Sequence, residues 1–241
     1  MVKKTAAVFI YAVIALSVPA SAQSVNKIIK KHLKAMGGVK KIKSVETVKM
    51  TGTIDVQGNV APIVFYRKRP DLFCIESKTD FGVYLMGFDG EKSWIYNSYV
   101  GDTEPKIQSD EESAMSKEDY DIDGLLVDYK KKGNKVELAG KEDVDGKEVF
   151  KLIVTHPSGR ERRLVIDAGN YLVLSESYTQ MTDGVVADHE TRLKDHSTIE
   201  GLTYARVWEQ VVNGEMQARS TIENVEINKG IDDAVFKPRM E

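Results

Sequence analysis

The side chains that most often carry catalysis or bind metals are few and far apart in this sequence. The four histidines are scattered: His32, His156, His189 and His196. Asp188-His189-Glu190 and Asp195-His196 could supply metal ligands, but on a strand Asp188 and Glu190 face one side and His189 faces the other. That pattern favours a polar sheet surface over a metal site. No pairing of nucleophile and base and no phosphate-binding glycine loop is present. We therefore expect no enzyme, no metal and no cofactor.

The single cysteine and the charge balance exclude further classes of function. Cys74 lies in the apolar run Leu72-Phe73-Cys74-Ile75, which predicts a buried, unreactive thiol. One cysteine cannot form a disulfide within the chain. Lys and Arg number 34 against 37 Asp and Glu, for a formal net charge of −3. The chain therefore lacks the excess of positive charge that is typical of proteins that bind nucleic acid.

What the sequence offers instead is apolar and aromatic side chains on neighbouring strands. They fall between residues 65 and 96: Phe65, Tyr66, Phe73, Phe81, Tyr84, Met86, Phe88, Trp94 and Tyr96. Two interpretations remain open, an ordinary core and the lining of an apolar cavity. A cavity of this kind would suit an acyl chain, whose burial contributes about 0.8 kcal/mol per methylene.

The elements that must position these residues are mostly strands. Residues 23–36 predict an amphipathic helix that ends at Gly37-Gly38. From residue 45 onward the hydrophobic period changes to two, which is typical of strands. The predicted strands are 47–54, 60–67, 72–77, 81–88, 93–96, 135–138, 148–155, 161–166, 171–177, 185–193, 203–212 and 216–227. Turn pairs such as Asp145-Gly146 and Asn213-Gly214 indicate tight hairpins between them.

One insertion, residues 110–132, interrupts the strand pattern. It begins with acidic and ends with basic residues, as a helix dipole prefers, and Ser109 with Glu112 forms a capping-box pattern. Gly124 predicts a break into two helical pieces, and Ile122, Leu125, Leu126 and Tyr129 form an apolar stripe in this segment.

The sequence therefore predicts a mainly β fold with few helices, an antiparallel barrel of about eleven or twelve strands. Its linkers are too short for parallel crossovers. A sheet of this length curls, and two short helices cover little of its inner face. An unclosed barrel with a helical lid over an apolar cavity is the expected architecture.

The N-terminus has the pattern of a secretory signal peptide. Lys3 and Lys4 precede an apolar run from Ala6 to Val18, and small residues at Ala20 and Ala22 follow. The run is too short for a membrane anchor, which needs about 20 apolar residues. We expect cleavage after Ala22, export to the periplasm as a soluble monomer, and a single domain over residues 23–241.

Three segments, in order, resemble periplasmic lipoprotein carriers of the LolA type. The first, Tyr66-Arg67-Lys68-Arg69-Pro70-Asp71-Leu72-Phe73, is similar to the family's Lys-Arg-Pro-x-Leu-Phe. The second, residues 88–97 with Asp89-Gly90 and Trp94-Ile95-Tyr96-Asn97, is similar to a family hairpin. The third is Asp232-Asp233-Ala234-Val235-Phe236-Lys237-Pro238. Ala35-Met36-Gly37-Gly38 is typical of a broader group of LolA/LolB-like lipoprotein-sorting proteins.

The resemblance implies an eleven-stranded half-barrel, with helices as a lid over a cavity for lipoprotein acyl chains or other lipids. It implies an inner-membrane donor and an outer-membrane acceptor. Arg69 is then the arginine that holds the lid, and Ile122, Leu125 and Leu126 occupy the place of the lid helix. The cavity lining would be drawn from Tyr66, Phe73, Ile75, Tyr84, Met86, Trp94 and Tyr96. A lipid-sensing or partner-binding module of the same fold, with no transport role, is the alternative.

Overall fold

The computed structural model describes residues 25–182 and 184–240. The predicted signal peptide, residues 1–22, lies outside the described residues. Within the described part of the chain, the helices are all too short or too polar to cross a bilayer.

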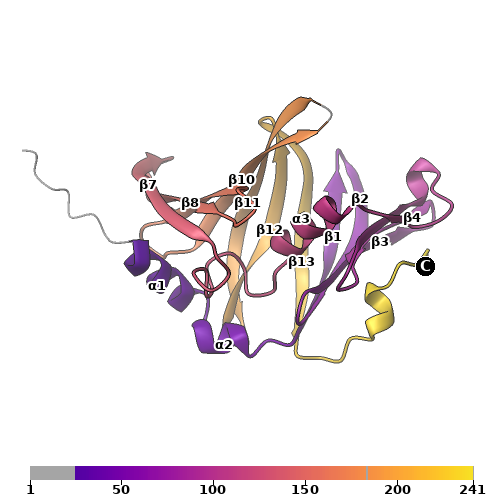
Figure 1. Cartoon of the computed structure of the whole chain (residues 1–241), viewed down its shortest axis with the longest axis horizontal. Coiled ribbons are helices and arrows are strands. Elements are labelled where there is room, and N and C mark those ends of the chain that lie inside the picture. Colours follow the sequence, from indigo (N-terminus) through magenta and orange to yellow (C-terminus); the bar gives the residue numbers. More distant parts are fainter. Residues whose placement is uncertain (1–24, 183, 241) are drawn as a thin grey trace, which may run out of the picture.

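The strands form one antiparallel sheet of thirteen strands (Figure 1). They are β1 Thr47–Val56, β2 Asn59–Lys68, β3 Leu72–Thr79, β4 Gly82–Phe88, β5 Ser93–Asn97, β6 Lys106–Ile107, β7 Lys135–Val144, β8 Lys147–Thr155, β9 Glu161–Asp167, β10 Val173–Thr182, β11 Val185–Ile199, β12 Leu202–Val212 and β13 Glu215–Ile227. The prediction missed only β6, which spans two residues and is too short to show an alternating pattern.

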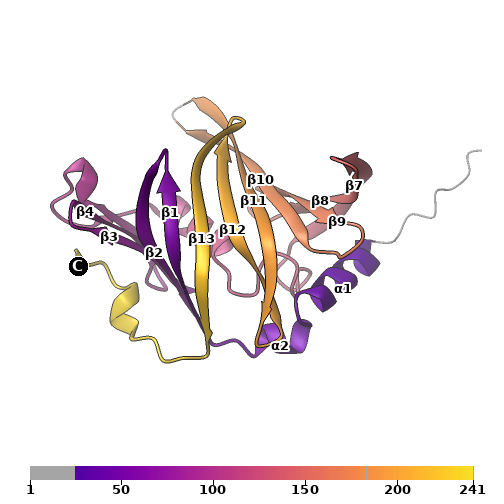
Figure 2. The same cartoon turned by 180° about the vertical axis from the view of Figure 1, so that it is seen from behind.

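The order of strands shows why the barrel stays open. It runs β6-β5-β4-β3-β2-β1-β13-β12-β11-β10-β9-β8-β7, so β1 pairs with β13 in the middle and β6 and β7 are the two edges. Segment 108–134 connects those two edges and therefore has to cross the concave side of the sheet. Figures 1 and 2 show the curled sheet with this connection on one side only. The predicted unclosed antiparallel architecture is confirmed.

Tight turns between strands follow the sequence signals. Asp145 and Gly146 have φ of 51° and 76°, and Asn213 and Gly214 have φ of 50° and 84°. Positive φ at both central residues is the requirement of a type I′ hairpin turn, which Asp-Gly and Asn-Gly satisfy at little cost.

Two helices precede the sheet, α1 Val25–Ala35 and α2 Val39–Lys43. The apolar face of α1 buries Ile28 and Ile29 against β8 and β9 residues such as Leu152 and Ile166. Gly37 ends this helix with φ of 114°, and a Cβ there would lie 2.3 Å from the Gly201 carbonyl oxygen. The close approach fixes the helix end against the β11–β12 turn.

The crossing segment contains one helix, where two pieces were predicted. Helix α3 spans Asp110–Asp119, and Ser109 and Glu112 form the predicted capping box. Residues 120–134 form a series of turns, so the prediction of a second helical piece under the apolar stripe was wrong. Positive φ at Gly124 (72°) and Asp128 (49°) places both in the left-handed region, which an α-helix does not tolerate. We refer to residues 120–134 as the lid loop.

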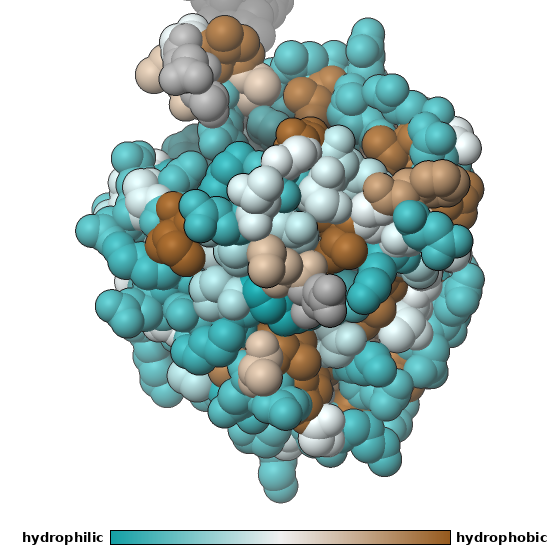
Figure 3. Space-filling view, turned by 90° about the vertical axis from the view of Figure 1, so that its right-hand side faces the viewer, coloured by the Kyte–Doolittle hydropathy of each residue, from teal (hydrophilic) through white to brown (hydrophobic). Residues whose placement is uncertain are grey.

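The two faces of the sheet carry separate cores. On the concave face, Met50 pairs with Phe65, Phe65 with Ile75, and Ile75 with Met86, which gives a row of apolar side chains across β1 to β4. On the convex face, Cys74, Leu85 and Trp94 are covered by Phe236 of the C-terminal 3-10 helix η2, Asp233–Phe236. Viewed from the right-hand side of Figure 1, the end with β3, β4 and the C-terminal segment, apolar side chains appear as separate groups among polar ones (Figure 3).

Candidate functional site

A cavity of about 310 Å³ lies between the concave face of the sheet, the lid loop and the ends of α1 and α2. Its volume is at the lower end of the range for small-molecule sites, roughly 300–1,000 Å³. The lining is mainly apolar: Leu33, Met36, Ile42, Val45, Val48, Met50, Ile122, Leu125, Leu126, Leu164, Val173, Leu193, Leu202, Ala205 and Trp208. A chamber with this lining can accept an apolar chain of small cross-section.

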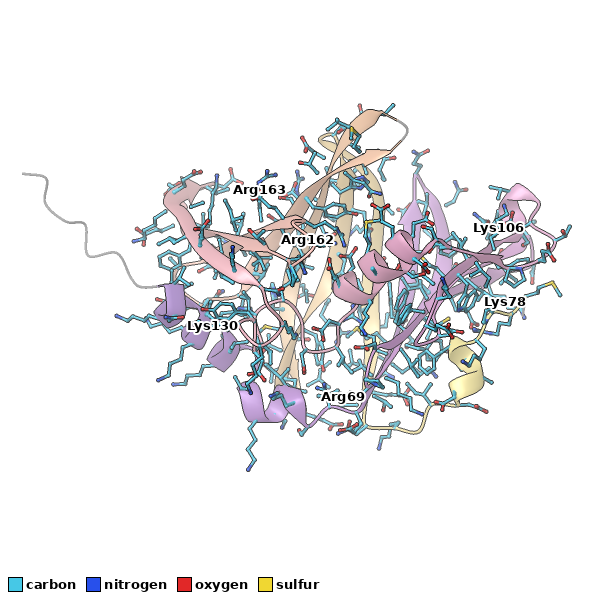
Figure 4. The ribbon with its side chains drawn as sticks, viewed as in Figure 1. Arg69, Lys78, Lys106, Lys130, Arg162 and Arg163 are labelled. Atoms are coloured by element: carbon cyan, nitrogen blue, oxygen red, sulfur yellow. The ribbon has the colours of Figure 1, made fainter. Side chains whose placement is uncertain are left out.

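Arg69 fastens the lid loop to the start of the sheet. Its guanidinium donates to both carboxylate oxygens of Asp123, at 3.1 and 2.5 Å. It also donates to the carbonyl oxygens of Val45 (2.6 Å) and Ile42 (3.2 Å). Figure 4 shows Arg69 at the end of the half-barrel next to α2. Because Asp123 lines the cavity, this ion pair links the α2–β1 connection directly to the loop that closes it.

Further contacts hold the lid loop at its other end. Lys132 forms an ion pair with Asp121 and donates to the Gly124 carbonyl at 2.8 Å. The Tyr129 hydroxyl donates to Asn26 of α1 at 2.9 Å. Leu126 and Val127 are buried, and Leu126 packs with Ile28 and Ile29. The lid loop is thus packed against the protein and held at both ends by ion pairs and hydrogen bonds.

The cavity wall also carries charged and titratable groups, whose place in a cavity the sequence did not predict. They are Arg67, Asp123, Glu176, His32 and His196. Burial lowers the pKa of both His32 and His196 below 6.5, which favours the neutral rings near neutral pH, and it raises the pKa of Glu176. His32 Nδ1 lies 2.9 Å from the Tyr171 carbonyl oxygen.

Of the predicted site residues, the lid stripe is the group that lines this cavity. Ile122, Leu125 and Leu126 all contact it, although they lie on a loop and not on a helix. Arg69 borders it through Asp123 and itself lines a separate, polar pocket of about 520 Å³ with Asp71, Lys117 and His156.

Four predicted residues lie on the concave face but outside the cavity lining: Phe73, Ile75, Tyr84 and Met86. The Phe73 ring stacks on Tyr120, with ring centroids 3.8 Å apart. Helix α3 contacts β4 and β5 and covers this part of the sheet. These side chains therefore form the part of the concave face that α3 covers, next to the cavity.

Tyr66, Trp94 and Tyr96 lie on the convex face, which corrects their predicted place in the cavity lining. Tyr66 pairs with Cys74, and both pack with Trp94 and Tyr96 in the cluster under the C-terminal segment. The Trp94 Nε1–H donates to the Phe236 carbonyl oxygen at 2.9 Å. The reason is strand parity, because Tyr66 is one residue from Phe65 and must point to the other face.

Two predictions about reactive residues hold. Cys74 is fully buried and free, and burial raises the pKa of its thiol. His189 stacks on Tyr178 while Asp188 accepts a hydrogen bond from Thr179 at 2.7 Å, so the two neighbours face opposite sides.

Comparison with known proteins identifies the class of fold. A putative outer membrane lipoprotein-sorting protein domain from Vibrio parahaemolyticus has a TM-score of 0.56 at 11% identity, over 87% of this chain and 94% of that one. A LolA superfamily protein from Nitrosomonas europaea has a TM-score of 0.56 at 11% identity, over 88% and 96%. A DUF1329 family protein from Desulfovibrio piger has a TM-score of 0.55 at 16% identity, over 88% and 97%.

The chain therefore has a LolA-like fold. No protein-family model matches its sequence, and no curated protein matches it either.

Proposed function

We propose that this protein is a periplasmic carrier that binds acyl chains of lipoproteins, or other lipids, in the cavity under the lid loop. The observation that carries the proposal is the mainly apolar chamber of about 310 Å³, closed by a loop that an arginine fastens. The LolA-like fold supports it, since two similar structures bear the names of lipoprotein-sorting and LolA superfamily proteins.

The binding energy in this proposal comes from apolar burial. Each methylene taken from water into the chamber contributes about 0.8 kcal/mol. An acyl chain that enters between the sheet and the lid loop displaces Leu125 and weakens the Arg69–Asp123 ion pair. Loading and release are then coupled to the position of the lid, which suits transfer from an inner-membrane donor to an outer-membrane acceptor without chemical catalysis.

Uptake of N-phenylnaphthylamine, a neutral dye whose fluorescence rises in apolar surroundings, tests the cavity. We expect saturable uptake by the protein after lipid removal, and its loss in Leu193→Trp, which fills the chamber from β11. Val186→Trp is the matched control on the same strand, because Val186 is 59% exposed. Absence of uptake by the unmodified protein, or equal uptake by both variants, would refute the proposal.

Transfer separates the carrier from the alternative, a lipid-sensing or partner-binding module. The protein is loaded with a fluorescent phospholipid and mixed with acceptor vesicles. A carrier delivers its lipid to the vesicles faster than the lipid moves between vesicles alone. Stable retention of the lipid would favour the sensing module.

A further inference from the structure

One charged residue of the cavity, Arg67, has no carboxylate of the described residues in direct contact with it. It lies on β2 opposite Val48 of β1, and both line the chamber. No described residue forms a hydrogen bond or an ion pair with its guanidinium, within residues 25–182 and 184–240. Its guanidinium Cζ lies 5.9 Å from the centroid of the Tyr120 ring, at the outer limit of a cation–π contact.

Glu176 and Asp121 attract the Arg67 guanidinium from a distance without binding it, and both carboxylates of the cavity wall are bound by other arginines. Asp123 is held by Arg69 in the two-pronged ion pair described above. Glu176 lies 3.7 Å from Arg162, which also binds Asp119. Figure 4 shows Arg162 inside the half-barrel, well away from Arg69. Burial lowers the pKa of both histidines below 6.5, so near neutral pH Arg67 is the one cationic group among the described residues that line the chamber.

An unpaired guanidinium in an apolar chamber is costly, since arginine stays protonated under all ordinary conditions. Burial lowers the pKa of Arg67, which shows that its surroundings disfavour the charged form. A group with anionic oxygens placed in the chamber would offset this cost, and guanidinium matches carboxylate and phosphate oxygens better than any other side chain.

We propose that the cavity selects amphiphiles with an anionic head group, a carboxylate or a phosphate, which Arg67 binds while the acyl chain lies along the apolar lining. This inference rests on the proposed function and names the class of lipid. An acyl chain in ester or amide linkage has no charge at its carbonyl, so it accepts a weaker hydrogen bond from Arg67 than a carboxylate or phosphate does.

Displacement of N-phenylnaphthylamine by three ligands of one chain length tests the inference: laurate, lauroyl lysophosphatidic acid and lauryl alcohol. The measurement is made at a pH where laurate is ionised. We expect one or both anionic ligands to bind about 10- to 100-fold more tightly than the alcohol, the size of a charge-assisted hydrogen bond. Comparison of laurate with the phosphate ligand decides which head group the site prefers.

Two variants locate the effect. Arg67→Met should bring the anionic ligands to within a few-fold of the alcohol while leaving the binding of the alcohol intact, which also shows that the variant folds. Arg163→Met, which removes an equal charge from an exposed position on β9, should keep the full preference. Equal binding of all three ligands by the unmodified protein would overturn this inference but not the proposed function. The same holds if Arg67→Met keeps the preference for anionic ligands. A protein that binds neither dye nor any of the ligands overturns the proposed function with it.

Discussion

Arg69 shows how a single side chain can set the state of the whole cavity. The resemblance to LolA-type carriers implies that this arginine holds the lid, and the structure gives it four hydrogen bonds, two to Asp123 and two to backbone carbonyls. The motif located Arg69 in the sequence. Its partner could not be predicted, because Asp123 lies on a loop whose path depends on positive φ angles that the apolar stripe does not reveal.

Replacing Arg69 by Leu should open the lid loop without unfolding the sheet. Each lost charge-assisted hydrogen bond contributes about 1.5–3 kcal/mol, so amide hydrogen exchange in residues 120–127 should speed up by roughly 10-fold or more. Arg192→Leu is the control and should leave exchange unchanged, because this exposed arginine binds Glu190 of its own strand and no lid-loop residue among those described. Global loss of protection in Arg69→Leu would show that Arg69 is needed for folding and does not act as a latch.

His32 makes stability depend on pH in a defined direction. Burial lowers the pKa of this ring below its usual 6.5, so the unfolded chain binds more protons than the folded chain at mildly acidic pH. The stabilisation is complete above about pH 6.5 and is lost progressively as the pH falls toward the folded-state value. The raised pKa of Glu176 has the opposite effect, because it makes the folded state more stable as the pH falls. The His32 contribution is therefore measured as the difference between the unmodified protein and a variant without this ring.

Urea unfolding of the unmodified protein and of His32→Asn, between about pH 7.5 and about pH 5, measures this contribution. The free energy of unfolding should fall less steeply with acidification in the variant, because one buried ring no longer has to be protonated. Parallel curves for the two proteins would contradict the assignment.

At the scale of elements, sequence patterns predict the positions of strands and turns well, but they do not predict which face of the sheet each side chain occupies. Alternation located twelve of the strands, and Asp145-Gly146 and Asn213-Gly214 marked their turns. Alternation alone does not say which face is concave. Phe65 and Tyr66 are neighbouring aromatic residues, and only the pairing register shows that Phe65 faces Met50 and Trp208 while Tyr66 faces the C-terminal segment.

The C-terminal segment should protect Cys74. Phe236 is fully buried against Trp94 and Leu85, so Phe236→Ala should lower the free energy of unfolding by about 3–5 kcal/mol. It should also make the Cys74 thiol reactive toward a disulfide reagent such as DTNB in the folded protein. Val100→Ala, at a position 73% exposed, should change neither quantity measurably. An unreactive thiol in Phe236→Ala would mean that other side chains cover Cys74.

At the scale of the whole molecule, topology creates the cavity. Because β1 and β13 pair in the centre, the edges β6 and β7 are joined by one segment that must pass over the concave face. The chamber lies where the lid loop of that segment meets α1, α2 and the sheet. Sequence reasoning predicted an open barrel and a covering insertion. It did not predict Arg67, Glu176, His32 and His196 in the wall, since these come from four distant segments that only the register brings together.

The central claim, that a lipid occupies the chamber under the lid loop, is tested most directly by native mass spectrometry of protein isolated from the periplasm without detergent. The account predicts an added mass, released as an acyl lipid, on the unmodified protein and on Val186→Trp, and its absence on Leu193→Trp. An unmodified protein isolated without bound lipid, or the same lipid on Leu193→Trp, would contradict it.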